Sequence, residues 1–222
     1  SIKDSCNLVL QEELDILFYL DIGMDPQTYL MSLSRLALVQ ASGSGHIQTS
    51  GSSNIDYYIS CRDMETDNSD IYFTERLIRM ERIPVNISIP KVNTKNITRS
   101  DLNISDKTFL IGLPHSIFKL HPDFDIILER IIEEIPHSKL FLFEDKRNND
   151  IEVLKSRWIE NNKFILNKTI IHPRVSFDEY ISILKCFDIV LDPFYSGMGV
   201  TFYHSMAYGI PVVSMPAIEM KG

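Results

Sequence analysis

The sequence predicts an α/β protein whose strands form parallel sheets. Short apolar runs of strand length alternate with segments of helix length over most of the 222 residues. Several runs are apolar at consecutive positions, which is typical of strands buried on both faces of a sheet. Five strand–helix units follow residue 107, and repeated units of this length imply a parallel sheet that helices cover on both faces.

The first half alternates strand and helix. We expect a buried strand at 14–20, further strands at 38–41 and 55–60, a helix from 26 to about 36, and a helical turn followed by a strand within 69–80. Asp25 is a suitable N-cap for the first helix. Pro26 suits the first helical position because the N–H it lacks would be unpaired there.

The second half has clearer boundaries. We expect strands at 108–113, 139–143, 169–171, 188–191 and 211–215, and helices at 122–134, 150–160, 177–187 and 199–208. Ser176 is a suitable N-cap, since its hydroxyl can accept from an unpaired N–H. Between the halves, residues 84–105 are rich in Asn, Thr and Pro without a sustained period, which predicts a linker.

The strongest functional signal is a glycine-bearing turn after the strand at 188–191. Asp192-Pro193 leads into Ser196-Gly197-Met198-Gly199, and a helix follows. A helix that starts at such a turn presents unpaired backbone N–H groups to an anion. Gly197 and Gly199 allow close approach of the backbone, and Thr201 suits phosphate oxygens. We therefore expect a phosphate-bearing ligand here.

Three other side chains lie where ligands bind in such folds, beyond the carboxyl ends of strands. The Lys119 ammonium can reach a diphosphate; a solvated surface lysine is the alternative. Tyr180 offers a ring for stacking on a base, or is an ordinary helix aromatic. In the loop 45–51, His46 is a candidate contact for a sugar or an acceptor, or a histidine without a role.

Composition limits the partners. The chain has a formal net charge of −8 and is 44% hydrophobic, an ordinary globular composition that disfavours nucleic acid and anionic membranes. No apolar run approaches the roughly 20 residues that span a bilayer, and no signal peptide is evident.

The cysteines indicate neither a disulfide framework nor a zinc ribbon. Cys6, Cys61 and Cys186 are odd in number and far apart, which favours a reducing cytoplasm, with Cys186 as a buried thiol. His115 and His121 lack a carboxylate partner suited to zinc, so we expect no structural metal.

Five ordered segments together resemble the catalytic region of the O-linked N-acetylglucosamine transferase family, including its SPINDLY-like bacterial members. They are 14–25 (LDILFYLDIGMD), 38–57 (LVQASGSGHIQTSGSSNIDY), 72–80 (YFTERLIRM), 117–124 (IFKLHPDF) and 191–216. The resemblance covers most of the chain, and it lies in the order and spacing of the segments, because each alone is modest.

The resemblance implies a GT-B fold, with two Rossmann-like domains that contain parallel sheets. It assigns residues 1–88 to the C-terminal part of the acceptor-side domain, 89–105 to a linker and 106–222 to the nucleotide-sugar-binding domain. On this interpretation the chain is a fragment, with the first domain only partly present and the second truncated at its C-terminus.

The implied activity is metal-independent, inverting transfer of a hexose, N-acetylglucosamine in the family, from a UDP-sugar to Ser/Thr hydroxyls of a protein or peptide. The UDP-sugar is the donor substrate, and no cofactor is implied. Lys119 and His46 carry the implied catalytic roles, with Ile47 beside His46. Val175 falls where the family's backbone recognises uracil, and Tyr180 where its histidine stacks on the base. The implied donor-binding residues are Ser116, Lys119, Val175, Tyr180, Gly197, Gly199, Val200, Thr201 and His204.

The chain departs from the family at four positions: two of these donor-binding residues and two residues close to them in the sequence. His204 stands where the family places an acidic residue that binds the ribose, and Val200 and Phe202 replace polar or small residues. Phe177 stands where many members carry lysine. The family's proposed catalytic histidine would precede Ser1.

Two alternatives therefore remain open. One is another GT-B enzyme, either a peptide N-glucosyltransferase or a sugar-nucleotide epimerase. The other is a nucleotide-sugar-binding module without turnover.

Overall fold

The computed structural model describes residues 1–43, 45–84, 86, 88–92, 96–145 and 148–215. These residues fall into two compact units, one within Ser1–Asn86 and one within Ile87–Met215. Every strand pairing in both sheets is parallel, which confirms the predicted fold class.

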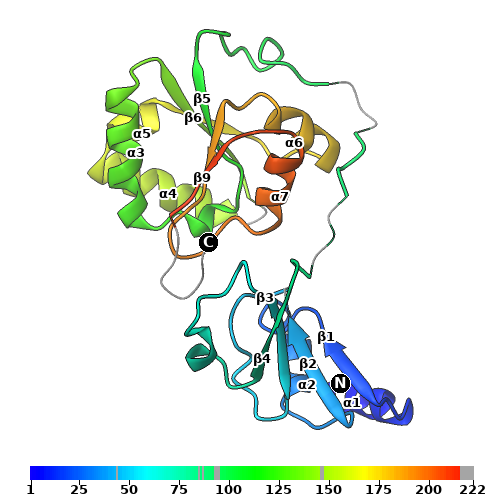
Figure 1. The fold of residues 1–222 in the computed structure, drawn as a ribbon. Helices are drawn as coiled ribbons and strands as arrows, with labels where there is room; N and C mark the ends of the chain where they lie inside the picture. Colours follow the sequence, from blue (N-terminus) through cyan, green and yellow to red (C-terminus); the bar gives the residue numbers. More distant parts are fainter. Residues whose placement is uncertain (44, 85, 87, 93–95, 146–147, 216–222) are drawn as a thin grey trace. The chain divides into compact units, whose positions relative to one another are not determined.

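The first unit contains a four-stranded sheet in the order β1-β2-β3-β4 (Figure 1). Its strands are β1 (Ile16–Tyr19), β2 (Val39–Gly43), β3 (Tyr57–Cys61) and β4 (Arg76–Met80), and its helices are α1 (Ile2–Gln11), α2 (Pro26–Ser32) and the 3-10 turn η1 (Ser69–Tyr72). The Thr28 N–H donates to Asp25 Oδ2 at 2.8 Å, so the predicted cap of α2 is confirmed.

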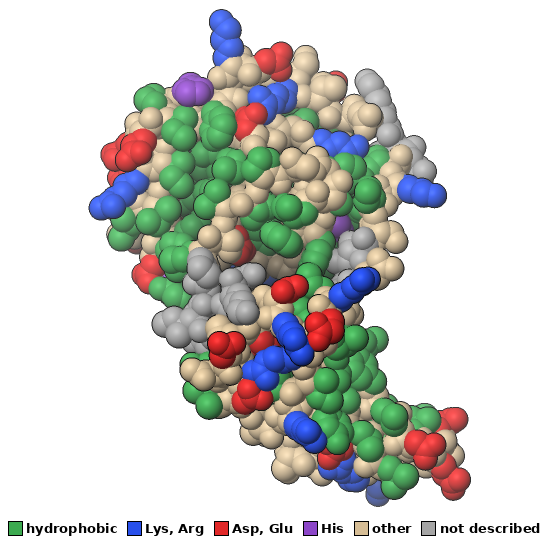
Figure 2. Space-filling model, in the orientation of Figure 1, with side chains coloured by type: hydrophobic (Ala, Val, Ile, Leu, Met, Phe, Trp, Pro, Cys, Tyr) green, Lys and Arg blue, Asp and Glu red, His purple; other side chains and the backbone are tan. Residues whose placement is uncertain are grey.

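Three expectations for this unit need correction. Helix α2 ends at Ser32 and not at about residue 36. Helix α1 was not predicted, although Ser1 and Asp4 form a reciprocal capping box at its start. The strand β1 exists where predicted, but within it only Tyr19 is buried, while Ile16 and Phe18 are exposed. Since β1 is an edge strand of the described sheet, helices do not enclose it as they would a central strand. Figure 2 shows hydrophobic side chains gathered over this edge.

The second unit contains a five-stranded sheet in the order β7-β6-β5-β8-β9. Its strands are β5 (Phe109–Leu113), β6 (Ser138–Phe143), β7 (Thr169–His172), β8 (Ile189–Leu191) and β9 (Val212–Val213). Its helices are α3 (Pro122–Glu134), α4 (Asn148–Asn161), α5 (Lys163–Asn167), α6 (Phe177–Leu184), α7 (Val200–Ala207) and the 3-10 turn η2 (Ile117–Lys119). The predicted elements are all present, α6 ends three residues early, and α5 was missed.

Successive side chains of β5 and β6 point to opposite faces of the sheet, so the core of this unit has two halves. Ile111 and Leu140 face one side, where α3, α4 and α5 contribute Leu128, Trp158 and Ile165. Leu110 and Phe141 face the other side, where α6 packs. Figure 1 shows α3, α4 and α5 on one face of the sheet and α6 and α7 on the other. The carboxyl ends of the strands are therefore the part that helices leave open.

From residue 88 onward, the described part of the segment predicted as a linker belongs to the second unit. Ile104 is buried, and Ile97 and Leu102 pack against the same core as α6. Arg99 ties this segment to the end of α6 and the start of β8: its Nε donates to the Cys186 carbonyl at 2.9 Å, and its Nη2 lies 2.6 Å from Asp188 Oδ2. Local turn hydrogen bonds, such as that from the Ile104 N–H to the Arg99 carbonyl at 2.8 Å, and these tertiary contacts together give this irregular stretch a fixed course.

No helix among the described residues is long and apolar enough to cross a membrane. Cys186 is a buried free thiol, as expected, and burial raises its pKa.

Replacing Arg99 should destabilise the second unit strongly. Arg99→Ala removes the partner of Asp188 and hydrogen bonds to two backbone carbonyls, those of Cys186 and Thr108. We expect the free energy of unfolding to fall by about 2–3 kcal/mol, because a charged, partly buried group loses its partner. Chemical denaturation measures this change in the free energy of unfolding. Lys155→Ala, which removes an exposed pair with Glu152, is the control and should change stability by less than about 0.5 kcal/mol. Equal effects would contradict this assignment.

Candidate functional site

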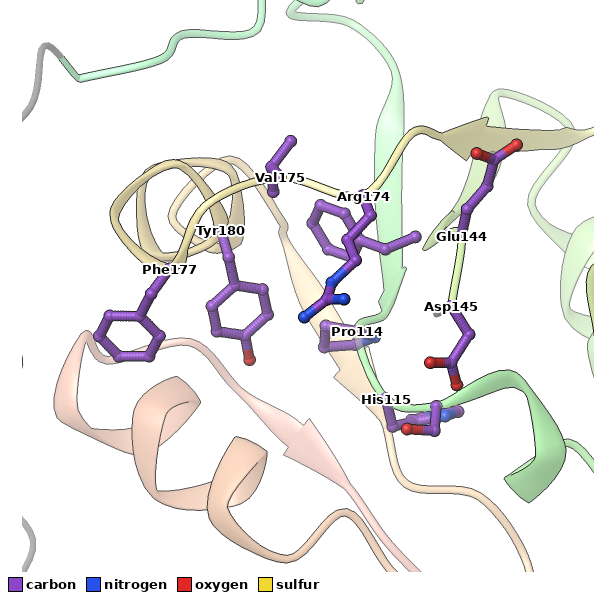
Figure 3. Close-up of a pocket in the computed structure, with 10 residues that line it drawn as sticks. Pro114, His115, Glu144, Asp145, Arg174, Val175, Phe177 and Tyr180 are labelled. Carbon is purple, nitrogen blue, oxygen red and sulfur yellow. The ribbon is translucent and has the colours of Figure 1, made fainter. Parts of the chain in front are cut away.

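A pocket of about 280 Å³ opens at the carboxyl edge of the larger sheet. Figure 3 shows that its lining comes from the segments that follow β5, β6 and β7 and from the start of α6. The lining residues are Pro114, His115, Ser116, Phe143, Glu144, Asp145, Arg174, Val175, Phe177 and Tyr180. Three of the predicted donor-binding residues, Ser116, Val175 and Tyr180, are thus brought to one cavity.

Lys119 lies at the end of η2 and reaches across to the glycine turn. Its Nζ donates to the Gly197 carbonyl at 2.5 Å, which joins the segment after β5 to the segment after β8. Burial lowers the pKa of Lys119, and the Asp192 carboxylate opposes that shift. Because β5 and β8 are the strands between which the chain order reverses, this contact lies at the switch point where ligands bind in such sheets.

The glycine turn is shaped by backbone conformation. Tyr195, Gly197 and Gly199 all have positive φ, at 68°, 37° and 61°. A Cβ on either glycine would meet nothing within 4 Å, so glycine is required by the left-handed φ rather than by close packing. Gly199 is the N-cap of α7 and supplies no side-chain oxygen, which leaves the first N–H groups of the helix available to a ligand.

An aromatic cluster separates α7 from the pocket. The Tyr180 ring lies 6.0 Å from His204, 5.6 Å from Phe143 and 6.1 Å from Phe177, measured between ring centroids. Burial raises the pKa of Tyr180, to which the Thr201 side chain is adjacent. Burial also lowers the pKa of His204. The imidazole that replaces the expected acidic residue therefore favours its neutral form.

The remaining predicted residues divide into two groups. The first group does not line the pocket and lies instead at the switch point and around α7. Its members are Lys119, Gly197, Gly199, Val200, Thr201 and His204. Val200 is exposed at the start of α7, as is Phe202. His46 and Ile47 belong to the first unit, where the His46 Nδ1 accepts from the Gln48 N–H at 3.2 Å.

Sequence reasoning missed two functional candidates in the pocket. Arg174 directs its guanidinium into the cavity in Figure 3 and supplies positive charge beside Val175. His115 is buried, and neither ring nitrogen has a hydrogen bond of acceptable geometry within the described chain, although the backbones of Ser116 and Leu191 lie near the ring. Both residues follow a predicted strand, which was the available signal.

No group of three or more His, Cys, Asp and Glu side chains in the described ranges is arranged to hold a metal ion.

Comparison with known proteins gives two kinds of match. No family model matches the chain. Two curated relatives, UDP-glucose:protein N-β-glucosyltransferases from strains of Actinobacillus pleuropneumoniae, are each 28% identical over 187 residues, which is 80% of this chain and 28% of the relative. The chain thus spans little more than a quarter of the length of these relatives.

The solved structures decide the fold. The Thermobaculum terrenum O-GlcNAc transferase matches with a TM-score of 0.80 at 20% identity, over 100% of this chain and 42% of that chain. The chain has the GT-B fold. HepE from Anabaena, solved with UDP and glucose, matches with a TM-score of 0.59 at 11% identity, over 96% of this chain and 62% of that one.

The buried imidazole of His115 should make stability depend on pH. Burial first, and nearby Lys119, lower the pKa of His115 to about 4, against an ordinary value of 6.5. Between these values the unfolded chain binds a proton that the folded chain does not, so the free energy of unfolding should fall as the pH falls from 6.5 to 4, by at most about 1.4 kcal/mol per unit.

Denaturation of the protein and of His115→Leu at pH 7 and pH 5 measures this slope. The variant should lose much of the difference between the two pH values, whereas His137→Gln, at an exposed position, should retain it. Identical slopes in all three proteins would show that His115 does not titrate as described.

Proposed function

We propose that this chain is the donor-binding part of a glycosyltransferase that moves a hexose from a UDP-sugar to a protein acceptor. The contact of Lys119 with Gly197 carries the proposal, since it places an ammonium beside the uncapped start of α7 at the switch point of the sheet. A diphosphate bound there would meet positive charge and oriented N–H groups together.

The proposed chemistry stabilises the leaving group. As the bond between the sugar and the diphosphate breaks, negative charge grows on the diphosphate oxygens. Lys119 and the first N–H groups of α7 would bear that charge, the role that a divalent cation has in other transferases. The Lys119 ammonium donates to the Gly197 carbonyl and forms no direct ion pair with Asp192. Exchanging that one hydrogen bond for a contact with a phosphate oxygen would need only a short movement of the side chain.

The pocket provides a place for the base. Val175 offers its backbone to the uracil edge, and Arg174 offers a guanidinium to a base carbonyl. Tyr180 already packs against three rings, whereas Phe177 is 53% exposed at the pocket wall. We therefore propose that Phe177 shares the stacking role that the resemblance assigns to Tyr180. His204, in its neutral form, would donate or accept one hydrogen bond to a ribose hydroxyl where the family uses a carboxylate.

The finer proposal is inverting, metal-independent transfer of N-acetylglucosamine to Ser/Thr hydroxyls, with His46 and Ile47 near the donor sugar and acceptor. The curated relatives support a second candidate, glucose transfer to asparagine, because their names describe N-glucosyltransferases and they match 80% of this chain. A binding module without turnover is the third, suggested by His204, Val200 and Phe202. The SPINDLY-like relationship and the cytoplasmic location stay predictions.

UDP should stabilise the protein through Lys119. We expect millimolar UDP to raise the Tm by several degrees, and Lys119→Ala to remove most of that shift, because binding to the folded state alone stabilises it. Lys139→Ala, at an exposed position on the same sheet, is the matched control and should keep the shift. Differential scanning fluorimetry measures it, and no shift in a folded wild-type protein would contradict the proposed function.

Product analysis separates the acceptor classes. Serine-bearing and asparagine-bearing peptides are incubated with UDP-N-acetylglucosamine or UDP-glucose and examined by mass spectrometry. The leading proposal expects a modified serine peptide whose sugar is lost in mild alkali. A glucose that survives alkali on the asparagine peptide would establish the second candidate. UDP binding with no product would favour the module without turnover.

A further inference from the structure

The loop between β2 and β3 is held by buried groups that the sequence analysis did not single out. It contains His46 and Ile47, and it returns along the sheet through Thr49 and Ser50 before β3 begins at Tyr57. Gly45 passes so close to the Leu20 carbonyl that a Cβ would lie 1.4 Å from that oxygen. The start of the loop is therefore packed tightly on the segment after β1.

Glu75 binds the returning half of this loop. Its side chain is buried, with the whole residue 5% exposed, immediately before β4. Its Oε1 accepts from the Ser50 N–H at 2.7 Å and from the Ser50 hydroxyl, and its Oε2 accepts from the Thr49 and Thr74 hydroxyls at 2.6 and 3.1 Å. Four donors thus converge on one carboxylate.

These donors keep the carboxylate charged. Burial by itself would raise the pKa of Glu75, but the hydrogen bonds from Ser50 and Thr49 outweigh it and hold the pKa below its ordinary value. A buried carboxylate is costly unless hydrogen bonds satisfy it, so ionised Glu75 favours the one loop conformation that supplies them.

Tyr58 binds the first half of this loop, which contains His46. It is a buried residue of β3, and its hydroxyl donates to the His46 carbonyl. Since the His46 Nδ1 accepts from the Gln48 N–H, the neutral imidazole carries its proton on Nε2. The ring also packs against Gly23, where a Cβ would lie 3.0 Å from two ring carbons. Tyr58 thus holds the backbone of His46, while Gln48 and Gly23 restrict its ring.

We propose that Glu75 and Tyr58 are positioning residues that hold the loop 45–52 in the conformation that fixes His46 Nε2–H, the donor that the proposed function assigns to the reacting sugar or acceptor. The role of His46 rests on the proposed function; the binding of the loop by Glu75 and Tyr58 does not. A positioned donor reacts faster than a mobile one, and a displacement of about 1 Å can cost a factor of about 100 in rate.

Three variants test the inference in the intact protein. Glu75→Gln keeps the shape but replaces an acceptor oxygen with an NH2 group that faces hydroxyl and N–H donors. Tyr58→Phe removes only the hydrogen bond to His46. Glu65→Gln is the matched control, because Glu65 is also buried in this unit and accepts from Ser60 at 2.6 Å, in a contact outside the loop.

Hydrogen exchange measured by mass spectrometry reports on the loop without any activity. Glu75→Gln should speed exchange in peptides covering 45–52 by about tenfold or more, Tyr58→Phe should do so mainly around His46–Gln48, and Glu65→Gln should leave these peptides unchanged. Loop exchange in Glu75→Gln and Tyr58→Phe equal to that of Glu65→Gln would overturn the inference.

Kinetics and UDP binding then separate positioning from general damage. Glu75→Gln and Tyr58→Phe should lower kcat for transfer by about 10- to 100-fold while the UDP-induced Tm shift stays at the wild-type value, since the donor pocket lies in the other unit. An unchanged kcat despite a mobile loop would also overturn the inference. If wild-type protein binds no UDP, the proposed function fails, and loop exchange still decides whether Glu75 and Tyr58 hold the loop.

Discussion

The burial of parallel strands on both faces is the constraint on which the rest of this structure depends. Consecutive apolar residues in β5 and β6 force helices onto both sides of the larger sheet, and those helices supply Trp158 and Leu128 on one side and Ile181 and Leu184 on the other. Polar chemistry is then confined to the carboxyl edge, where strands end and backbone groups lose their sheet partners. The pocket and the glycine turn both lie at that edge.

Two cationic side chains lie at this edge, and the described residues hold no group of side chains arranged for a metal ion. Lys119 bridges two segments that are 78 positions apart in the chain, and Arg174 lines the neighbouring pocket together with the Glu144 and Asp145 carboxylates. Burial disfavours the charged form of Lys119, so an incoming diphosphate would relieve a cost already present in the free protein. Burial also disfavours the charged form of His115, so this histidine is neutral in the pocket wall near pH 7.

The likeness to solved GT-B structures is much stronger in shape than in sequence. A TM-score of 0.80 accompanies only 20% identity with the Thermobaculum terrenum protein. The two measures differ because a GT-B sheet requires only apolar strands and suitable turns, and many different sequences meet these requirements. The fold therefore does not by itself specify a donor or an acceptor, and under the proposed function that choice would depend on single residues such as His204 and Phe177.

The sequence alone determined the order and type of nearly all elements, because periodicity, caps and turn residues act locally. Asp25, Ser176 and Pro122 marked helix starts that the structure confirms, and α3 begins and ends at the residues predicted. Lys119 and the glycine turn were selected because each follows a predicted strand. Their contact is consistent with the single anion site that was expected, but local pattern could not specify it.

Tertiary structure alone decided which distant groups meet. Arg99 fixes a stretch without periodicity by reaching Cys186 and Asp188, partners nearly 90 positions away. Glu75 and Tyr58 act on the His46 loop through hydrogen bonds between segments 12 to 26 positions apart. The burial of His115 and the exposure of β1 likewise depend on what packs beside them. Such contacts arise from the three-dimensional path of the chain, and no local signal in a single sequence encodes them.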